Sequence, residues 1–252
     1  YLCPKFIVLE TLKPYGQAGE SKKKEVQKMF DNIAGSYDML NAVLSFGMDG
    51  YWRKKAIHQF PDATLPLRVL DVACGTGDMC LQAFRYYPSY RYLGVDLSAG
   101  MLQVGRNRIG KLKLVDKISM EQGDCENLHY DEASFDLVMA AFGVRNFENL
   151  DAGLQHMHRV LQSGGKVIIL EFSRPRIFPF KQLYNFYFRN ILPLVGRFGS
   201  KDANAYKYLY ESVQQFPDYE RFTDRLTACG FSNCTITPLT FGICCVYTGI
   251  KI

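Results

Sequence analysis

The sequence lacks several features that would assign it quickly to a class. No apolar run approaches the roughly 20 residues that a membrane-spanning helix needs. The eight cysteines contain no C-x-x-C pair, and no cysteine or histidine cluster has zinc-ligand spacing, so we predict no metal site. Several cysteines lie in apolar runs typical of strands, where a free thiol behaves as a small hydrophobic side chain. We therefore expect reduced cysteines and a cytoplasmic protein.

The bulk composition is that of a globular protein. Hydrophobic residues make up 48% and charged residues 22% of the chain, which excludes a largely disordered protein. A length of 252 residues suits one α/β domain with added helices better than two independent domains. The net charge of +5 permits contact with an anionic membrane or with RNA and indicates neither.

From residue 68 onward, short β-rich runs alternate with helical stretches. We predict five strands at 68–73, 91–96, 117–124, 135–141 and 166–173, with a turn at 163–165 before the fifth. Two further strands at 234–240 and 243–250 are joined by a tight turn at Gly242. This alternation favours parallel pairing through right-handed crossovers, hence a three-layer α/β domain with seven strands that ends in a hairpin.

Two segments depart from this alternation. Residues 21–60 are expected to form helices, with Ser21 as the first N-cap and Lys22–Lys24 on a solvated face. Residues 174–213 are dense in Phe, Tyr and Leu and contain three prolines, which indicates an inserted helical cap. We predict an N-terminal arm at 1–20 and a single domain at 21–252 that includes both helical segments.

The stretch VLDVACGTGD (69–78) joins the first predicted strand to its helix and has the character of a cofactor-binding turn. Gly75 and Gly77 let the backbone approach a ligand closely, and the turn presents N–H groups near a helix N-terminus. Asp96, at the end of the second strand, can accept hydrogen bonds from both hydroxyls of a ribose. NAD and S-adenosylmethionine both fit this layout, and so does a turn without a ligand.

The choice between these cofactors depends on charge. The dinucleotide fingerprint needs a third glycine where this chain has Cys80. Asp71 precedes the turn and would repel a pyrophosphate, whereas it would attract the ammonium of a methionine group. Asp124, at the end of the third strand, offers another acceptor near an adenine edge. We therefore favour S-adenosylmethionine.

Four further motifs make the sequence similar to a known family. They are F-D-x-I-A-x-x-Y-D-x-x-N-x-x-L-S-F-G (30–47) followed by Trp52-Arg53, FGVRNFENL (142–150), LEFSRP (170–175) and YKYLYES (206–212). Together with the turn, they resemble the UbiE-type C-methyltransferases of menaquinone and ubiquinone biosynthesis over about residues 24–251. The resemblance implies a class I methyltransferase fold, Rossmann-like, with a seven-stranded sheet whose last strand is antiparallel. It also implies methyl transfer to a ring carbon of a reduced prenylated quinone.

By the resemblance, the cofactor-binding residues fall on the turn and on the ends of the neighbouring strands. Cys125 and Ala141 stand where the family commonly has alanine and a small hydroxyl residue, respectively. The candidate cofactor-binding residues are Asp71, Gly75, Thr76, Gly77, Asp96, Leu97, Asp124, Cys125 and Ala141.

A ring carbon becomes nucleophilic when the adjacent phenol, with a free pKa of about 10, is ionised. We expect Arg145 to stabilise that anion, although it could instead belong to a structural ion pair. In residues 30–55, Tyr37, Asp38 and Asn41 could bind the ring oxygens or the amino-acid end of the cofactor. Asp38 and Tyr206 are weaker candidates for moving the proton. Phe30 and Trp52 could cover the cofactor or simply pack in the core.

The substrate assignment keeps several alternatives. We favour demethylmenaquinol, because the short N-terminus and the VACGTGD turn resemble the menaquinone branch. The alternative acceptors are a ubiquinone precursor, both quinones, RNA or another small molecule. A further alternative is a non-catalytic scaffold. The RNA alternative requires basic residues around the active-site mouth, and we expect no nucleic-acid partner. A lipid-soluble substrate implies transient association with the inner face of the cell membrane. The aromatic residues of 174–213 could supply a groove for the prenyl tail, and a homodimer is an open option.

Overall fold

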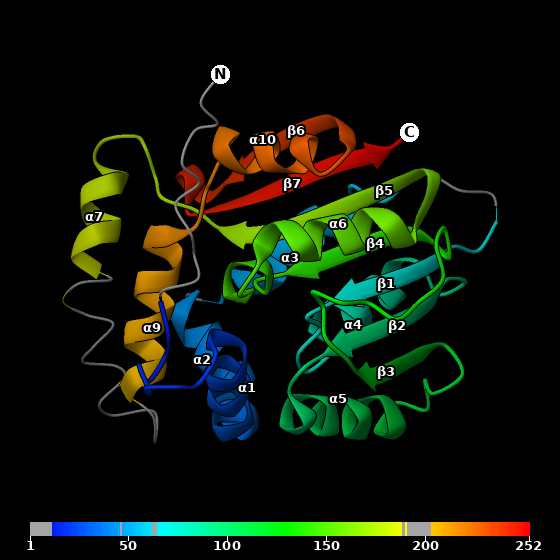
Figure 1. The fold of residues 1–252 in the computed structure, drawn as a ribbon, viewed down its shortest axis with the longest axis horizontal. Coiled ribbons are helices and arrows are strands. Elements are labelled where there is room, and N and C mark those ends of the chain that lie inside the picture. Colours follow the sequence, from blue (N-terminus) through cyan, green and yellow to red (C-terminus); the bar gives the residue numbers. More distant parts are fainter. Residues whose placement is uncertain (1–11, 46, 62–64, 188–189, 191–202) are drawn as a thin grey trace.

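The computed structural model describes residues 12–45, 47–61, 65–187, 190 and 203–252. Its centre is a seven-stranded sheet in the order β3-β2-β1-β4-β5-β7-β6, as Figure 1 shows. The first five strands pair in parallel, and β7 runs antiparallel to both β5 and β6. The predicted sheet with its final hairpin is therefore confirmed. The strands are β1 (Arg68–Val72), β2 (Arg91–Asp96), β3 (Ile118–Gln122), β4 (Phe135–Ala141), β5 (Leu161–Phe172), β6 (Phe231–Leu239) and β7 (Cys244–Lys251).

The start of β5 differs from the prediction. The strand follows directly after the preceding helix at Leu161, and residues 162–165 are part of it. Its pairing with β4 shifts from Phe135↔Leu161 to Leu137↔Lys166, so these residues form a bulge. Gly164 has φ +78°, a conformation that glycine adopts without strain. The Ser-Gly-Gly signal therefore marks a bulge inside the strand instead of a turn before it.

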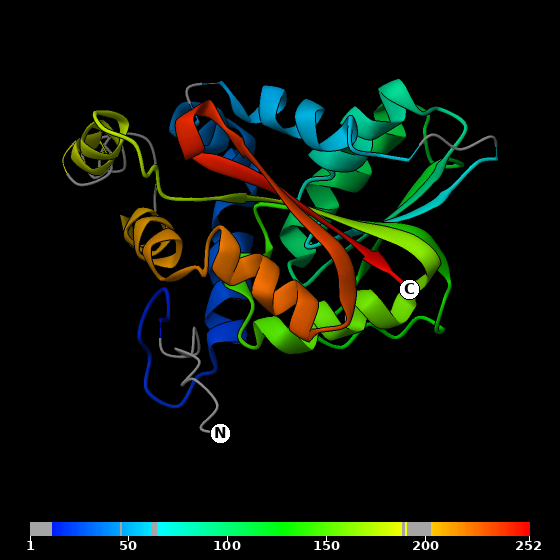
Figure 2. The same ribbon diagram turned by 90° about the horizontal axis from the view of Figure 1, so that it is seen from above.

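Helices cover both faces of the sheet, as the view from above shows (Figure 2). Because successive strand side chains point to opposite faces, β1 places Val69 in one core cluster and Leu70 in the other. The first cluster includes α3 (Asp49–Ile57), α4 (Asp78–Tyr86) and α5 (Ala99–Lys111), and the second includes α6 (Leu150–Val160) and α10 (Glu220–Ala228). The short 3-10 helices are η2 (Ala34–Ser36), η3 (Val144–Asn146) and η5 (Thr240–Gly242).

A third cluster joins the two helical segments that the sequence set apart. Helices α1 (Lys22–Ile33) and α2 (Tyr37–Leu44) lie beside α9 (Ala203–Gln215), with α7 (Phe180–Phe186) on the outer side (Figure 1). Val26, Met29 and Ile33 of α1 pack with Ala205 and Tyr208 of α9 and with Tyr184 of α7. We call α1, α2, α7 and α9 the lid region. None of the described helices is long and apolar enough to cross a membrane.

Polar contacts fix the start of α1. The Ser21 hydroxyl accepts a hydrogen bond from the Lys24 N–H, which confirms the predicted N-cap. Buried Glu25 accepts hydrogen bonds from the N–H groups of residues 15, 16 and 17 of the N-terminal arm. Lys22 is also buried, and its ammonium donates to the carbonyl of Phe147 at 2.6 Å. The expected solvated face is therefore wrong for Lys22, because the partner carbonyl belongs to a segment 125 residues away.

Candidate functional site

The glycine turn connects β1 to α4 at the carboxyl edge of the parallel strands. Gly75 and Gly77 both have positive φ, +55° and +81°, which explains why glycine stands at these positions. A Cβ on Gly77 would lie 3.3 Å from the Met120 methyl group. The Gly75 N–H donates to the Asp96 carboxylate at 2.8 Å, so the turn is tied to the end of β2.

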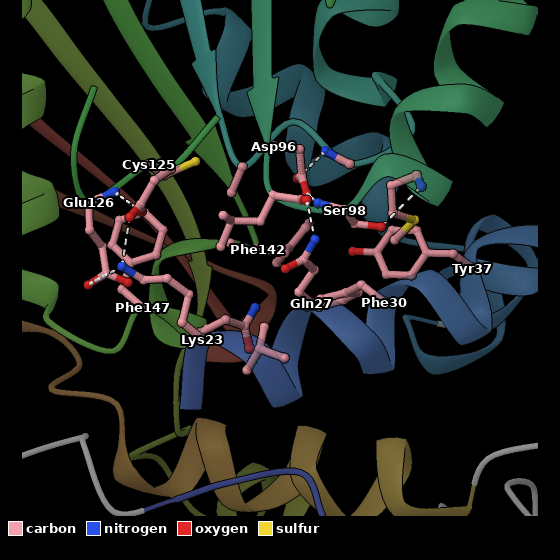
Figure 3. Close-up of a pocket in the computed structure, with 18 residues that line it drawn as sticks. Lys23, Gln27, Phe30, Tyr37, Asp96, Ser98, Cys125, Glu126, Phe142 and Phe147 are labelled. Atoms are coloured by element: carbon pink, nitrogen blue, oxygen red, sulfur yellow. Dashed lines mark hydrogen bonds and ion pairs between the residues drawn. The ribbon is translucent and has the colours of Figure 1, made fainter. Parts of the chain in front are cut away.

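A cavity with about 610 Å³ of empty space lies between this turn and the lid region. Figure 3 shows Gln27 and Phe30 of α1 facing Asp96 and Ser98 at the strand edge, whereas Lys23 points toward Glu126. We call this space, which also includes Tyr37 at one end, the cofactor cavity. The other lining residues are Val26, Ala73, Gly75, Leu97, Met101, Asp124, Cys125, Glu126, Phe142, Gly143, Asn146 and Phe147.

Asp96 lies at the centre of the cofactor cavity. It accepts hydrogen bonds from the N–H of Gly75 and, at 2.9 Å, from the N–H of Ser98. Burial raises its carboxyl pKa, and these two N–H groups oppose that shift by stabilising the charged form. A carboxylate keeps lone pairs free beyond two accepted bonds, so Asp96 can still accept from a ligand hydroxyl.

The predicted adenine side is also in the cofactor cavity. Asp124 pairs with the Lys23 ammonium at 2.8 Å, a contact that joins α1 to the strand edge. Cys125 is buried beside it, and burial raises the pKa of its thiol well above the usual range. Leu97 lines the same cavity, and its carbonyl accepts hydrogen bonds from Gln27 and Gln122. The structure therefore brings Leu97, Asp124 and Cys125 together.

A second, more polar cavity adjoins the turn and is lined by Tyr37, Arg53, Asp71, Ala73, Cys74, Gly75, Thr76, Asp78, Met79 and Ala141. Asp71 is buried, and its Oδ1 has no hydrogen-bond partner among the described residues. Burial raises the Asp71 pKa to about 7. Arg53 is buried as well, and its Nε has no partner within the described part of the chain. An orphan acceptor and an orphan donor of opposite charge therefore line the same space.

A third cavity, with about 440 Å³ of empty space that includes its opening to solvent, lies between α1, α2, η3 and α9 and is called the acceptor cavity here. It is lined by Met29, Phe30, Ile33, Tyr37, Asn41, Arg145, Asn146, Ala205, Tyr208 and Leu209. Phe30, Tyr37 and Asn146 line the cofactor cavity too, so the two spaces are neighbours. The acceptor cavity is mostly apolar, and Arg145 is its one cationic lining residue among those described.

Arg145 is both a cavity residue and half of an ion pair. Its Nη1 lies 2.8 Å from a carboxylate oxygen of Glu171 on β5 and donates to the carbonyl of Phe142. Its guanidinium also stacks over the Phe172 ring, 5.4 Å from the ring centroid. Burial raises the Glu171 pKa, and the Arg145 charge opposes that shift. The two interpretations of Arg145 left open by the sequence are therefore compatible.

The remaining predicted residues divide between these sites and the core. Tyr37 lines all three cavities, and burial raises its phenol pKa, so it stays a neutral donor at physiological pH. Asp38 is not a lining residue of these cavities: it accepts from the Thr76 hydroxyl at 2.7 Å and pairs with Arg108 at 3.0 Å. The side chain of Tyr206 lies outside the described part. Trp52 does not cover a ligand; it is buried and donates to the Thr240 hydroxyl.

Four lining or supporting residues were not identified as site residues from the sequence: Arg53, Asn146, Glu171 and Tyr208. Each stands in or beside a motif that carries the resemblance, Trp52-Arg53, FGVRN, LEFSRP and YKYLYES. The motifs were therefore a usable signal. The sequence does not say which motif side chains face a cavity, because this depends on packing between distant segments.

Comparisons with known proteins place the chain among methyltransferases of quinone biosynthesis. The model of the ubiE/COQ5 methyltransferase family matches residues 18–251. The demethylmenaquinone methyltransferase of Bacteroides fragilis is 43% identical over 96% of this chain and 98% of its own. That of Porphyromonas gingivalis is 44% identical, covering 91% and 94%. The ubiquinone/menaquinone biosynthesis C-methyltransferase UbiE of Geotalea daltonii is also 44% identical, covering 91% and 97%.

Two solved structures with similar folds are methyltransferases, each at low sequence identity. A methyltransferase from Thermotoga maritima, described as a possible histamine N-methyltransferase dependent on S-adenosylmethionine, has a TM-score of 0.64. It is 18% identical and covers 90% of this chain and 99% of its own. The phosphoethanolamine N-methyltransferase 2 of Haemonchus contortus has a TM-score of 0.60 at 16% identity, covering 80% and 52%. These similarities support the class I methyltransferase fold.

Proposed function

Because the chain belongs to the ubiE/COQ5 methyltransferase family, we propose that it transfers a methyl group from S-adenosylmethionine to demethylmenaquinol, giving menaquinol. The observation that carries this proposal is the adjacency of two unlike cavities. One is lined by carboxylates that suit a cationic cofactor, and the other is an apolar space with a buried arginine. Phe30, Tyr37 and Asn146 line both, so a donor and an acceptor could meet there.

The residues of the cofactor cavity fit S-adenosylmethionine. Asp96 would accept from the ribose hydroxyls, with Leu97, Asp124 and Cys125 along the adenine side. The orphan Asp71 oxygen suits the cofactor's ammonium, and the orphan Arg53 Nε suits its carboxylate. Thr76 and Ala141 would border that amino-acid end, and the turn at Gly75 and Gly77 gives room for close backbone approach.

The methyl group comes from the sulfonium, whose S–C bond breaks as the new bond to a ring carbon forms. The ring carbon then loses its proton, so the net change replaces a ring hydrogen with methyl. The protein must favour the ionised phenol, whose free pKa is about 10. Arg145, held by Glu171 in a dry cavity, would lower that pKa by stabilising the quinolate.

The proton needs an acceptor other than Arg145, because an arginine is effectively always protonated. We propose a water beside Arg145, with Tyr206 as a further candidate. Asp38 better suits a positioning role, since it accepts from Thr76 and pairs with Arg108, which ties α2 to the glycine turn. Tyr37 and Asn41, one helical turn apart on α2, would bind the ring oxygens.

The location of the substrate suggests a membrane-facing surface. Ile177, Phe178, Leu183 and Phe186 of the α7 segment are each at least 60% exposed, and Phe241 is 58% exposed. Phe241 stacks on Phe180 at 3.7 Å between ring centroids, so η5 contacts the α7 segment. It lies beside α9, whose Tyr208 and Leu209 line the acceptor cavity (Figure 1). We propose that this surface, called the α7 surface, attaches the protein to the inner face of the cell membrane.

Vesicle sedimentation would test the α7 surface. Replacing Phe178, Leu183 and Phe186 by Asp should weaken binding to vesicles of phosphatidylglycerol and phosphatidylcholine by at least about tenfold, since each charge would enter an apolar layer. The matched control replaces the exposed Leu112 and Val115 by Asp, which should leave binding unchanged. Equal vesicle binding by the triple variant and the wild type would contradict the proposal.

Similarity to the ubiquinone/menaquinone biosynthesis C-methyltransferase of Geotalea daltonii also favours a second acceptor, a ubiquinone precursor. The experiment that decides is transfer of labelled methyl from S-adenosylmethionine to reduced demethylmenaquinone and, in parallel, to a demethoxy-ubiquinol-type acceptor, in detergent. We expect label on the naphthoquinol. Label only on the benzoquinol would shift the assignment to the ubiquinone branch. Label on neither, with the cofactor bound, would contradict the proposed function.

A further inference from the structure

The acceptor cavity contains an unusual set of polar atoms. Four lining side chains each have one buried nitrogen or oxygen without a hydrogen-bond partner among the described residues. Such atoms are uncommon in folded proteins, and each costs free energy unless a ligand or water satisfies it. Among the described residues, the second cavity has two such side chains, Arg53 and Asp71, and the cofactor cavity has one, Asn146. The four atoms are Asn41 Nδ2, Arg145 Nε, Asn146 Oδ1 and Tyr208 Oη.

Their chemistry limits what could satisfy them together. Asn41 Nδ2 and Arg145 Nε can only donate, and the Tyr208 hydroxyl can donate or accept. Asn146 Oδ1 can only accept, so its partner must carry a hydrogen on nitrogen or oxygen. Tyr208 and Asn146 are 2% and 8% exposed, which leaves little water to take the partner's place. The cavity therefore offers up to three donors and a single obligatory acceptor.

This inventory matches a hydroquinone that has lost one proton. The charged oxygen accepts up to three hydrogen bonds, and the other oxygen still carries a hydrogen to donate. We propose that Tyr208 and Asn146 are substrate-binding residues, and that Asn146 Oδ1 selects the reduced ring by accepting from its remaining hydroxyl. This inference rests on the proposed function and deepens it, since it assigns the recognition of the ring's redox state to named atoms.

The oxidised ring would bind less tightly than the reduced ring, because it has no hydroxyl to donate to Asn146 Oδ1. A quinone has two carbonyl oxygens and no hydroxyl, so it can satisfy the donors but leaves Asn146 Oδ1 buried and unpaired. Sites built to hydrogen-bond a ligand group discriminate strongly against an analogue that lacks it, because the buried partner is then left unsatisfied. We expect the wild-type protein to bind the hydroquinone at least about tenfold more tightly than the quinone.

The test measures binding rather than turnover. A short-chain demethylmenaquinone and its hydroquinone are titrated anaerobically into protein loaded with S-adenosylhomocysteine, by calorimetry. In Asn146→Leu the hydroquinone should bind about tenfold less tightly and the quinone equally well or better, so that the preference disappears. Tyr208→Phe should weaken both forms by a few-fold, because its hydroxyl can donate to either.

Folding controls and rival outcomes keep the inference falsifiable. Asn146→Gln retains the acceptor and should keep part of the preference, and cofactor binding by each variant reports an intact cofactor cavity. An unchanged redox preference in a folded Asn146→Leu protein would overturn the inference while leaving methyl transfer by the wild type untouched. Failure of the wild type to bind or methylate any hydroquinone would instead overturn the proposed function.

Discussion

The cofactor cavity and the acceptor cavity are neighbours, but they are built differently. In the cofactor cavity, Asp96 and Asp124 already have partners: two backbone N–H groups hold the first, and Lys23 holds the second. In the acceptor cavity, four buried polar atoms of the described lining residues have no hydrogen-bond partner among the described residues. The protein itself already pairs the carboxylates of the cofactor cavity, whereas a ligand would pair the polar atoms of the acceptor cavity.

The difference follows from how the chain folds. The cofactor cavity lies at the ends of adjacent parallel strands, where a turn and two strand ends meet because the sheet brings them there. The acceptor cavity is assembled from α1, α2, η3 and α9, which are up to about 180 residues apart in the sequence. Its polar side chains are therefore placed by packing between distant helices.

The largest expected effect is that of an Arg145 substitution, which should change the methyl-transfer rate without changing cofactor affinity. Arg145→Gln should lower the methyl-transfer rate by at least about 100-fold, because removing a charge-stabilising donor costs transition-state stabilisation. The dissociation constant for S-adenosylmethionine should change by less than about threefold. Single-turnover rates and calorimetry measure the two quantities.

Arg145→Gln also leaves Glu171 buried without its partner, which destabilises the fold by about 3–5 kcal/mol. The Arg145→Gln, Glu171→Gln double variant should recover much of that stability without recovering the rate. Arg176→Gln, which removes an exposed ion pair with Glu220, is the matched control. If Arg145→Gln lost cofactor affinity and methyl-transfer rate by equal factors, the two cavities would not have separate functions, which would contradict the comparison.

A smaller effect is expected from a substitution at the centre of the cofactor cavity, where cofactor affinity should fall and binding of the acceptor should not. Asp96→Asn should weaken S-adenosylmethionine binding by roughly 10- to 100-fold, as expected when charge-assisted hydrogen bonds are lost. Binding of the hydroquinone analogue should stay within a few-fold of the wild type. Asp136→Asn, which alters a carboxylate that accepts from the Arg68 N–H at the opposite end of β1, should change neither. Unaltered cofactor binding by Asp96→Asn would remove Asp96 from the site.

The smallest effect is a pH dependence from Asp71, whose folded pKa is about 7. The cofactor's ammonium favours the ionised carboxylate, so affinity should rise roughly tenfold between pH 5.5 and 7 and stay nearly flat in Asp71→Asn. In the free protein, the pH dependence of the free energy of unfolding has the opposite sign to that of cofactor affinity. The folded state retains a proton that the unfolded state has lost, so the free energy of unfolding should fall as pH rises from about 4 to 7.

Calorimetry of cofactor binding and chemical denaturation of the free protein measure these two pH dependences. A wild-type affinity that stays constant over this range would mean that Asp71 does not face the ammonium.

The same contrast explains how much the sequence could predict. The strands, the glycine turn and Asp96 were predictable because short-range patterns determine them. Arg53, Glu171 and Tyr208 were not assigned, because which motif side chains reach a cavity depends on long-range packing. Lys22 was misjudged for the same reason: its burial depends on the carbonyl of Phe147, in a distant segment. For Trp52 the sequence left covering the cofactor and packing in the core open, and the choice depended on Thr240, its partner near the other end of the chain.

The most direct test of the central claim is the position of the new methyl group. Wild-type protein is incubated anaerobically with carbon-13 methyl-labelled S-adenosylmethionine and reduced demethylmenaquinone, and the product is studied by nuclear magnetic resonance. A methyl carbon bonded to the ring, in a product that still oxidises to a quinone, is the predicted result. A methyl bonded to oxygen would contradict the account, because Arg145 would then be activating the phenol oxygen itself.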